Sequence, residues 1–597
     1  MVSLAQAQSS MIMYYESTKY AGFHSGTTRT RRDRIQERGK HTTMATFVKA
    51  PCDEGVIRSG AETSPCAPQV GVWVLVATIL GSSMAFIDGS VVNVALPVIQ
   101  QDLGATATDV QWIVETYALF LSSLILVGGS LGDRYGRRRI FALGIVVFTL
   151  SSIWCGLSLT VLSLILARAV QGIGAALLVP GSLAIISASF SEEQRGRAFG
   201  TWSGFSALTT VVGPVLGGVL VQYASWRWVF FLNVPLAVVV LVVLFWRVPE
   251  SRDPSASGRL DWWGTLLVTL GLGALVYGLL EAGSLGVGTP LVLGALALGV
   301  VALLAFVLVE ARSSAPMVPL TLFRSHTFSG ANLLTLLLYG AIGGISFFFP
   351  FNLIQVQGYS PTLAGAAFVP FILLMFLLSR WAGGLVHRYG AKLPLVIGPL
   401  ITAVGFALFA VPGITSGPSS YWTTFFPAVV VMGLGMSITV APLTTAVMGA
   451  VEQRHAGVAS GINNAVSRTA GLLAVAVFGI IALAVFTSSL QSQLIALHLS
   501  PSVYQVIEEQ RTRLAGITIP NTISGEVQTA LQRAIDASFV SAFRLVSLLG
   551  AAMALLSALC AWWLIEGKQP APAGSSATEP EASIVGAEQP APQTPAN

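Results

Sequence analysis

Long apolar runs recur along most of this 597-residue chain and constrain its fold more than any other feature. A helix needs roughly 20 apolar residues to cross a bilayer, and about fourteen runs reach that length. They begin near Gly71, Val110, Ile140, Val161, Arg197, Trp228, Trp262, Pro290, Phe328, Pro361, Leu393, Trp422, Ala456 and Asp536. Because 54% of the residues are hydrophobic and only 10% are charged, the sequence predicts an all-α integral membrane protein.

Basic residues in the short loops predict which side each loop occupies. One side carries about fourteen Lys or Arg, in loops that contain Arg137, Arg195, Arg252, Arg324, Arg388 and Arg454. The opposite short loops carry essentially only Arg227. Since positively charged loops stay in the cytoplasm, we expect both termini there and the chain in the plasma (inner) membrane. These loops also account for the net charge of +5, which therefore does not indicate nucleic-acid binding.

The apolar runs divide the chain into membrane bundles and polar segments. The expected order is a disordered cytoplasmic tail over 1–69, a six-helix bundle over 70–248, a linker with two inserted helices over 249–325, a second six-helix bundle over 326–566 and a disordered cytoplasmic tail over 567–597. The second bundle includes a long outer loop over 487–535 with short surface helices. We expect no cleavable signal peptide, and Met44 is an alternative start of the chain.

A stretch of glycine and arginine, GGSLGDRYGRRRI from Gly128 to Ile140, interrupts the apolar pattern between two helices. Gly128 and Gly132 share one helix face and allow a neighbouring helix to approach closely. Asp133 follows at the helix end, where it can pair with an arginine or cap a helix. The residues expected to form this conformational hinge are Gly129, Gly132, Asp133, Arg134, Gly136 and Arg137.

The hinge pattern occurs twice, which indicates an internal repeat. A shift of 254 residues places Gly129 on Gly383 and Arg134-Tyr135-Gly136 on Arg388-Tyr389-Gly390. A shift of 259 places Glu193-Gln194-Arg195 on Glu452-Gln453-Arg454. Helices 1 to 6 are therefore repeated by helices 9 to 14, and two such bundles are an architecture of secondary transporters.

Three charged residues lie inside apolar runs, where each costs about 3 kcal/mol or more unless it is paired or hydrated. Asp88 lies in AFIDGSVVNVALP, Glu115 in WIVETYALF and Arg168 in ILARAVQGIGAA. At a rise of about 1.5 Å per residue, all three reach a similar depth, so we expect them to share one layer. In that layer, a proton taken up by a carboxyl group would compete with the fixed arginine charge.

Two plainer interpretations of these charges stay open. Asp88 and Arg168 alternatively form only a helix-packing pair, and Glu115 alternatively faces water at the outer end of its helix. The repeat argues against packing alone, because the equivalent positions, Ile342 for Asp88 and Val429 for Arg168, are apolar. The charged layer is then expected in the first half only. The predicted proton-coupling and substrate residues are Asp88, Asn93, Glu115, Arg168 and Gln171.

The fifth apolar run contains Gly213-Pro214-Val215-Leu216-Gly217-Gly218. Proline removes a backbone donor and the glycines permit close packing, so the run predicts a bent helix that touches its neighbours. Such a kink also occurs for packing alone. The residues that we expect to matter are Gly213, Pro214, Gly217 and Gly218.

Taken together, these motifs resemble those of one family. The stretch over 128–140 resembles the signature loop between helices 2 and 3 of the major facilitator superfamily, and the fifth run resembles the antiporter signature of its drug exporters, with Thr209 at a position that is usually small. SWRWVFFLNVP over 225–235, DGSVVNVALP and ARAVQGIGAA resemble the fourteen-helix drug:proton antiporters of the EmrB/QacA type.

Over about residues 71–566, this resemblance implies the major facilitator fold, two six-helix bundles with two inserted helices. It also implies proton-driven export of amphipathic or cationic compounds, drugs or toxic metabolites, by alternating access. Asp88 is then the main proton site, Arg168 and Gln171 are its partners, and Glu115 is a second carboxyl. The expected partners are a small-molecule substrate, protons and the bilayer. Substrate identity, oligomeric state, proton stoichiometry and the need for a periplasmic adaptor protein stay open.

The sequence does not indicate an enzyme, a metal site or a cofactor. None of the six histidines lies well inside a spanning run, and the four cysteines are divided between the N-terminal tail and two apolar runs. No GxxxxGK[ST] phosphate loop occurs. Two other functions remain as alternatives to export: a proton-coupled importer or symporter of a small solute, and a membrane sensor that transports nothing.

Overall fold

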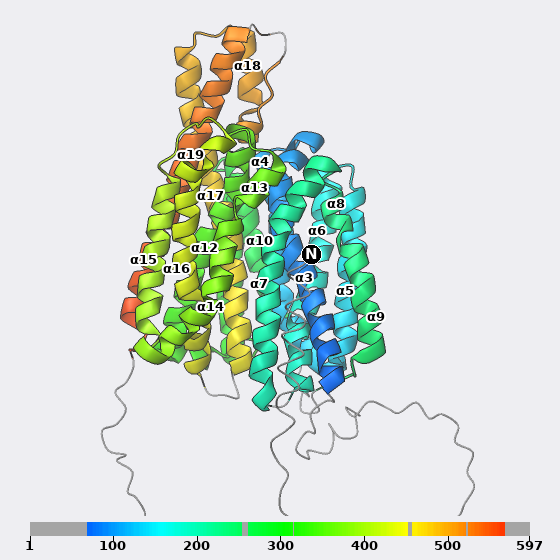
Figure 1. The fold of residues 1–597 in the computed structure, drawn as a ribbon. Coiled ribbons are helices and arrows are strands. Elements are labelled where there is room, and N and C mark those ends of the chain that lie inside the picture. The colour runs from blue at the N-terminus through cyan, green and yellow to red at the C-terminus, as the bar shows by residue number, and fades with distance from the viewer. Residues whose placement is uncertain are drawn as a thin grey trace, which may run out of the picture. The chain divides into compact units, whose positions relative to one another are not determined.

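The computed structural model describes residues 68–190, 192–252, 261–313, 316–451, 456–520, 523 and 525–567 (Figure 1). Helices are the regular structure of these ranges. The two predicted tails fall almost wholly outside the described residues, and so do Met44 and Glu452-Gln453-Arg454 of the repeat.

The first half of the chain forms seven described helices. They are α3 (Pro68–Leu103), α4 (Ala107–Tyr135), α5 (Arg137–Leu157), α6 (Val161–Ser189), α7 (Glu192–Tyr223), the short α8 (Trp228–Phe231) and α9 (Asn233–Arg247). The inserted pair follows as α10 (Trp262–Leu285) and α11 (Pro290–Arg312). Because α10 packs against both α4 and α17, the inserted pair contacts both halves of the chain.

The second half has a matching set of helices. In order these are η1 (Leu320–Arg324), α12 (His326–Phe351), the π-helical η2 (Asn352–Val356), α13 (Pro361–Ala366), α14 (Val369–Tyr389), α15 (Lys392–Phe409), η3 (Pro418–Ser420), α16 (Tyr421–Gly449), α17 (Ala456–Ala496), α18 (Pro501–Glu509), η5 (Arg511–Gly516) and α19 (Gly525–Leu564).

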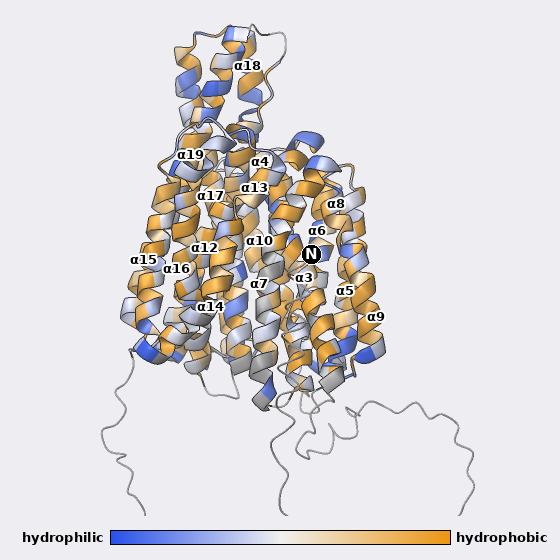
Figure 2. Cartoon of the chain, viewed as in Figure 1, coloured by the Kyte–Doolittle hydropathy of each residue, from blue (hydrophilic) through white to orange (hydrophobic). Residues whose placement is uncertain are grey.

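Thirteen helical segments of the described residues are long and apolar enough to cross a membrane. The helix α7 has a shorter apolar stretch, Val212–Tyr223, and supplies one more. The prediction of about fourteen spanning helices is therefore confirmed. Hydrophobic residues cover most of the length of the long helices (Figure 2), as expected where side chains face lipid.

The last helix differs from the sequence prediction. It was expected to begin near Asp536, but α19 begins at Gly525, and α17 continues to Ala496. Much of the predicted outer loop over 487–535 is thus helical, and it includes the amphipathic surface helix α18 as expected (Figure 1). The physical reason is that hydropathy detects only the part of a helix that faces lipid, whereas these helix ends are polar.

Close approach of helix backbones at glycines holds the first bundle together. A Cβ atom at Gly144 of α5 would lie 2.8 Å from the backbone nitrogen of Leu178 on α6. A Cβ atom at Gly174 of α6 would lie 2.8 Å from the Cα of Phe148 on α5. The buried side chains of Phe141 and Phe148 fill the space beside these contacts. Small residues let the two helices approach closely, which membrane helices need because lipid supplies no hydrophobic driving force.

Replacement of Gly144 by leucine should destabilise the first bundle, because the added side chain meets the backbone of α6. Overpacking of this kind costs about 1–3 kcal/mol. The matched control is Gly294→Leu on α11, where a Cβ atom meets nothing within 4 Å. We expect tryptophan fluorescence to give a lower melting temperature in detergent for Gly144→Leu than for the control. Equal melting temperatures would contradict this packing account.

Candidate functional site

A buried ion pair between Asp88 of α3 and Arg168 of α6 is the centre of the candidate site. Asp88 is 0% exposed and Arg168 is 1% exposed. The Nη1 atom of Arg168 donates to the Oδ2 atom of Asp88 at 2.5 Å. The prediction that these two residues meet inside the first bundle agrees with this geometry, and each charge compensates the other away from water.

Amide and hydroxyl groups complete the hydrogen bonding of this pair. Gln171 Nε2 donates to Asp88 Oδ1 at 2.9 Å and to Ser152 Oγ at 2.7 Å, while Gln171 Oε1 accepts from Arg168 at 2.7 Å. Asn233 Nδ2 lies 3.2 Å from Ser152 Oγ and 3.5 Å from Asp88 Oδ1. The sequence prediction included Gln171 but missed Ser152 and Asn233. Their signal was a polar residue within an otherwise apolar run.

Arg168 is fixed from a third side by α4. Its Nε atom donates to the backbone oxygen of Ile113 at 3.1 Å, and its guanidinium lies 4.2 Å from the centre of the Tyr117 ring. Four helices, α3, α5, α6 and α9, therefore contribute side chains to one polar network, called the Asp88 network below, which consists of Asp88, Arg168, Gln171, Ser152 and Asn233. A fifth helix, α4, adds the backbone oxygen of Ile113. A change in the charge of Asp88 is felt by all five helices.

Two predicted site residues do not join the Asp88 network. Glu115 is 0% exposed, so the alternative that it faces outer water is wrong. Neither of its carboxyl oxygens has a hydrogen-bond partner within the described ranges, and no contact links it to Asp88. Asn93 is partly exposed and donates only to Gly89 of its own helix, at 3.5 Å. The expected layer of two carboxyls and one arginine thus reduces to the pair of Asp88 and Arg168.

The expectation that intramembrane charge belongs to the first half only is also wrong. Arg468 lies within α17, in the span Val458–Ala496 of the second half. The apolar positions Ile342 and Val429 do not reveal it, because they lie on α12 and α16. The sequence signal that could have found it is a single arginine in NNAVSRTAGLL.

The predicted antiporter motif of α7 lies between the two halves. Gly213 and Gly217 face α3, where a Cβ atom at Gly217 would lie 3.3 Å from the Cα of Val91. Gly218 faces α13 of the second half, where a Cβ atom would lie 2.7 Å from the Cα of Thr362. From the other side, Gly365 of α13 packs directly against the backbone of Pro214. The helix α7 is therefore in contact with both halves along one short stretch (Figure 1).

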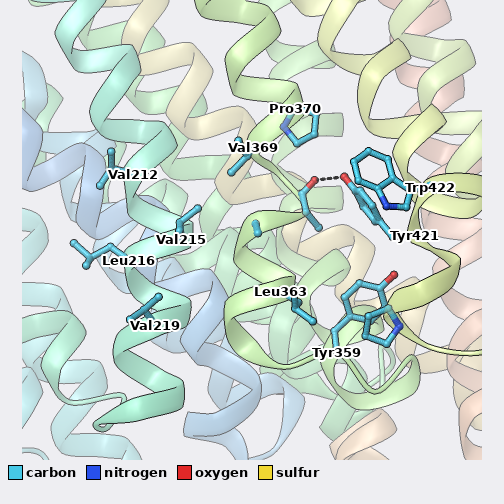
Figure 3. Close-up of a pocket in the computed structure, with 13 residues that line it drawn as sticks. Val212, Val215, Leu216, Val219, Tyr359, Leu363, Val369, Pro370, Tyr421 and Trp422 are labelled. Carbon is cyan, nitrogen blue, oxygen red and sulfur yellow. Dashed lines mark hydrogen bonds between the residues drawn. The ribbon is translucent and has the colours of Figure 1, made fainter. Parts of the chain in front are cut away.

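An apolar groove with a volume of about 840 Å³ lies beside this contact (Figure 3). Its walls come from α7 on one side and from α13, α14 and α16 on the other. Val215 and Val219 face Leu363 across the groove, and the Tyr421 hydroxyl donates to the backbone oxygen of Ala367 at 2.8 Å. The groove does not include the Asp88 network, so apolar surface and buried charge occupy separate places.

The predicted hinge carries an ion pair within its own segment. Arg137 Nε donates to Asp133 Oδ1 at 2.8 Å. Glu250, after α9, accepts from the backbone nitrogen of Arg138 at 3.0 Å and thereby caps the start of α5. Gly136 has a φ of +112° and lies against the Glu250 carboxyl, so the chain turns there as only glycine readily does. The sequence prediction missed Glu250.

The other predicted hinge residues have smaller contacts. Gly129 faces Pro180 of α6, with 3.6 Å from its Cβ position to the Cβ of that proline. Gly132 approaches Arg137 at 3.9 Å, and Arg134 lies over the ring of Tyr135. In the described ranges, no three His, Cys, Asp or Glu side chains are grouped so that they could hold a metal ion.

Comparisons with known proteins agree with this architecture. The family model of the Major Facilitator Superfamily matches residues 78–475. A tetracenomycin C resistance and export protein of Streptomyces glaucescens is 32% identical over 82% of this chain and 90% of its own length. The multidrug resistance protein Stp of Mycobacterium tuberculosis (strain CDC 1551 / Oshkosh) is 35% identical over 70% of this chain and 77% of its own length.

Among solved structures, a bacterial homologue of the human lysosomal transporter Spinster, in an inward-facing and unoccupied conformation, has the same fold. Its TM-score is 0.57 at 17% sequence identity, over 83% of this chain and 98% of that one. The matched residues, the helix count and the curated relatives together show that this chain is a multi-pass membrane protein of the Major Facilitator Superfamily and belongs to its fourteen-helix branch of drug resistance and export proteins.

Proposed function

We propose that this protein is a proton-coupled antiporter that exports amphipathic or cationic small molecules, drugs or toxic metabolites, from the cell by alternating access. In this proposal it lies in the plasma membrane with both termini in the cytoplasm. The observation that carries the proposal is the buried Asp88, whose carboxylate is paired with Arg168 inside a spanning helix. An intramembrane acid of this kind is a typical proton site.

Protonation of Asp88 would change the balance of the Asp88 network. In the described geometry both carboxylate oxygens accept hydrogen bonds, from Arg168 and from Gln171. A proton on Asp88 removes an acceptor and leaves the charge of Arg168 uncompensated in a buried place. Since Arg168 keeps its bonds to Gln171 and to the Ile113 carbonyl, the contact that weakens is the one between α6 and α3.

Helix packing connects the contact between α3 and α6 to the place where α7 meets α13 of the second half, called the seam below. Asp88 lies on α3 close in sequence to Val91, against which Gly217 of α7 packs. The next residue of α7, Gly218, packs against α13 of the second half. A shift of α3 on protonation therefore reaches the inter-bundle seam through one rigid helix. This continuity supports coupling between proton uptake and rearrangement of the two bundles.

The apolar groove beside the seam supplies a surface for amphipathic compounds. Its volume falls within the range of about 300–1,000 Å³ that drug-sized ligands occupy. The relatives are named for resistance to, or export of, tetracenomycin C, puromycin and methylenomycin A, which favours export over import of a nutrient. The same names give the membrane-sensor alternative no support.

The proposal is tested by transport in everted vesicles from a hypersensitive host that expresses the full chain. Addition of a fluorescent amphiphile should produce accumulation that depends on the proton gradient, together with release of protons from the vesicle. Accumulation that continues after the gradient is collapsed would contradict proton coupling. Susceptibility profiling of the same host selects the compounds to be tried.

Replacement of Asp88 by asparagine should abolish proton-driven efflux and keep substrate binding, because the amide accepts a hydrogen bond but cannot carry the proton. Binding and efflux are measured separately, and Asp88→Glu should restore part of the efflux. The matched control is Asp102→Asn, which changes a half-exposed aspartate bonded to Arg227. Efflux by Asp88→Asn that still follows an imposed pH gradient at the wild-type rate would show that Asp88 is not the proton site. Glu115 would then be the next candidate.

Replacement of Asp133 by asparagine should slow transport without removing the protein from the membrane. The change weakens the ion pair with Arg137 and shifts the equilibrium between conformations. A partly exposed pair of this kind contributes about 0.2–1 kcal/mol, so efflux should be roughly 1.5- to fivefold slower. Normal efflux at normal expression would show that the charges of the hinge only set the orientation of the helices in the membrane.

A valine at Gly218 should hold the two halves apart at the seam, since its Cβ atom would lie 2.7 Å from the Cα of Thr362. The control stays on the same helix: at Gly200 an added Cβ atom meets nothing within 4 Å. We expect efflux to be lost in Gly218→Val and retained in Gly200→Val, at equal expression. Equal efflux in the two variants would show that the seam does not need to close there.

A further inference from the structure

Arg468 of α17 differs from Arg168 in having no counter-charge among the residues that the structure describes. Arg168 is paired with Asp88, whereas Arg468 forms no ion pair with any residue that the structure describes. Its Nε atom donates to Asn464 Oδ1 of its own helix at 3.2 Å. A half-buried arginine in a spanning segment is costly, and such residues usually mark a pathway or binding site for a ligand.

The register of α17 against α4 shows which way Arg468 faces. Gly461, Arg468 and Val475 are each seven residues apart and so lie on one stripe of the helix. Both ends of this stripe touch α4: Gly461 approaches Leu126, and the Val475 carbonyl accepts from Gln111 at 3.2 Å. Arg468 lies midway between these contacts. Its side chain therefore emerges where the second half faces the first.

Tyr117 of α4 presents an unused hydroxyl to the same region. The residue is 5% exposed, and its hydroxyl has no hydrogen-bond partner among the described residues. Its ring is held by Arg168 at 4.2 Å. Tyr117 lies on α4 between Gln111 and Leu126, the two residues that contact the stripe of α17 on which Arg468 lies. The Arg468 guanidinium of the second half and the Tyr117 hydroxyl of the first half thus face the same interface. Both groups can still donate hydrogen bonds there.

We propose that Arg468 and the Tyr117 hydroxyl form an anion-binding subsite between the two halves, and that the exported compounds include amphipathic acids with an ionised carboxylate on an apolar body. This inference rests on the proposed function, because it assigns a substrate class to that exporter. The subsite would bind an anion, whereas the transporter is otherwise expected to take cationic compounds.

The chemistry of the two groups favours a carboxylate. The planar guanidinium donates in a fork that matches two carboxylate oxygens, and a phenol adds a third donor. Arg168 is already engaged by protein groups, since its Nη1 atom donates to Asp88 and Gln171 and its Nε atom donates to the Ile113 carbonyl. A bound anion would also compensate the charge that Arg468 brings into the membrane.

The test compares three probes with the same ring: 1-naphthoate, 1-naphthalenemethanol and 1-naphthylmethylammonium. Their binding to the purified full-length protein is measured by titration calorimetry in detergent. We expect the carboxylate to bind at least about tenfold more tightly than the alcohol, the order contributed by hydrogen bonds to a charged group. Wild-type protein that does not prefer the carboxylate, including protein that binds none of the three, overturns the proposal.

Variants assign the preference to the two residues. Arg468→Gln and, independently, Tyr117→Phe should each reduce the preference for the carboxylate over the alcohol, while Arg468→Lys should retain part of that preference. The control is Arg544→Gln on α19, whose guanidinium bonds the Val411 and Pro412 carbonyls away from this interface. A preference that survives in both Arg468→Gln and Tyr117→Phe overturns the proposal, and either variant suffices if the other does not fold.

Proton-driven efflux of a cationic amphiphile is measured in parallel. If that efflux occurs and no carboxylate preference is found, the exporter stands and the anion subsite fails. If the preference is found and no compound is transported, the subsite stands and the antiporter proposal fails. The two proposals can therefore fail separately.

Discussion

The ion pair between Asp88 and Arg168 is the interaction on which the first bundle depends. Neither group has access to water, so each requires the other, and removal of one partner from such a pair typically costs about 3–5 kcal/mol. Gln171 ties the pair to Ser152, and α4 fixes the arginine from the remaining side. Four helices therefore depend on one compensated charge, and α4 holds the arginine through a backbone oxygen.

The second bundle has the same helix pattern but no such pair. Ile342 and Val429 occupy the positions that correspond to Asp88 and Arg168, and Val429 is fully buried in apolar surroundings. The aromatic cluster around Phe349, with Phe409 and Phe543, packs that half densely. The two bundles therefore differ in how they are held together, the first by a buried ion pair and the second by aromatic packing, although the second also carries Arg468 in a spanning helix.

The helices could be predicted from the sequence because a bilayer demands long apolar runs, and starts such as Val161, Trp262 and Pro290 coincide with those observed. The start of α19 could not, because polar helix beyond the bilayer has no hydropathy signal. Side-chain partners were harder still. Depth along a helix placed Glu115 in the layer of Asp88, but depth does not give the direction in which a side chain points, and the geometry leaves Glu115 apart.

The helix α7 explains how events in the first bundle could reach the second without a long chain of contacts. Its glycines remove side chains on two faces at once, so that its backbone touches Val91 on one side and Thr362 on the other. Proline at 214 frees a backbone group and lets the helix bend between those contacts. A helix with side chains at these positions would separate the halves. Because of these glycines, only the width of the α7 backbone separates α3, which carries Asp88, from α13 of the second half.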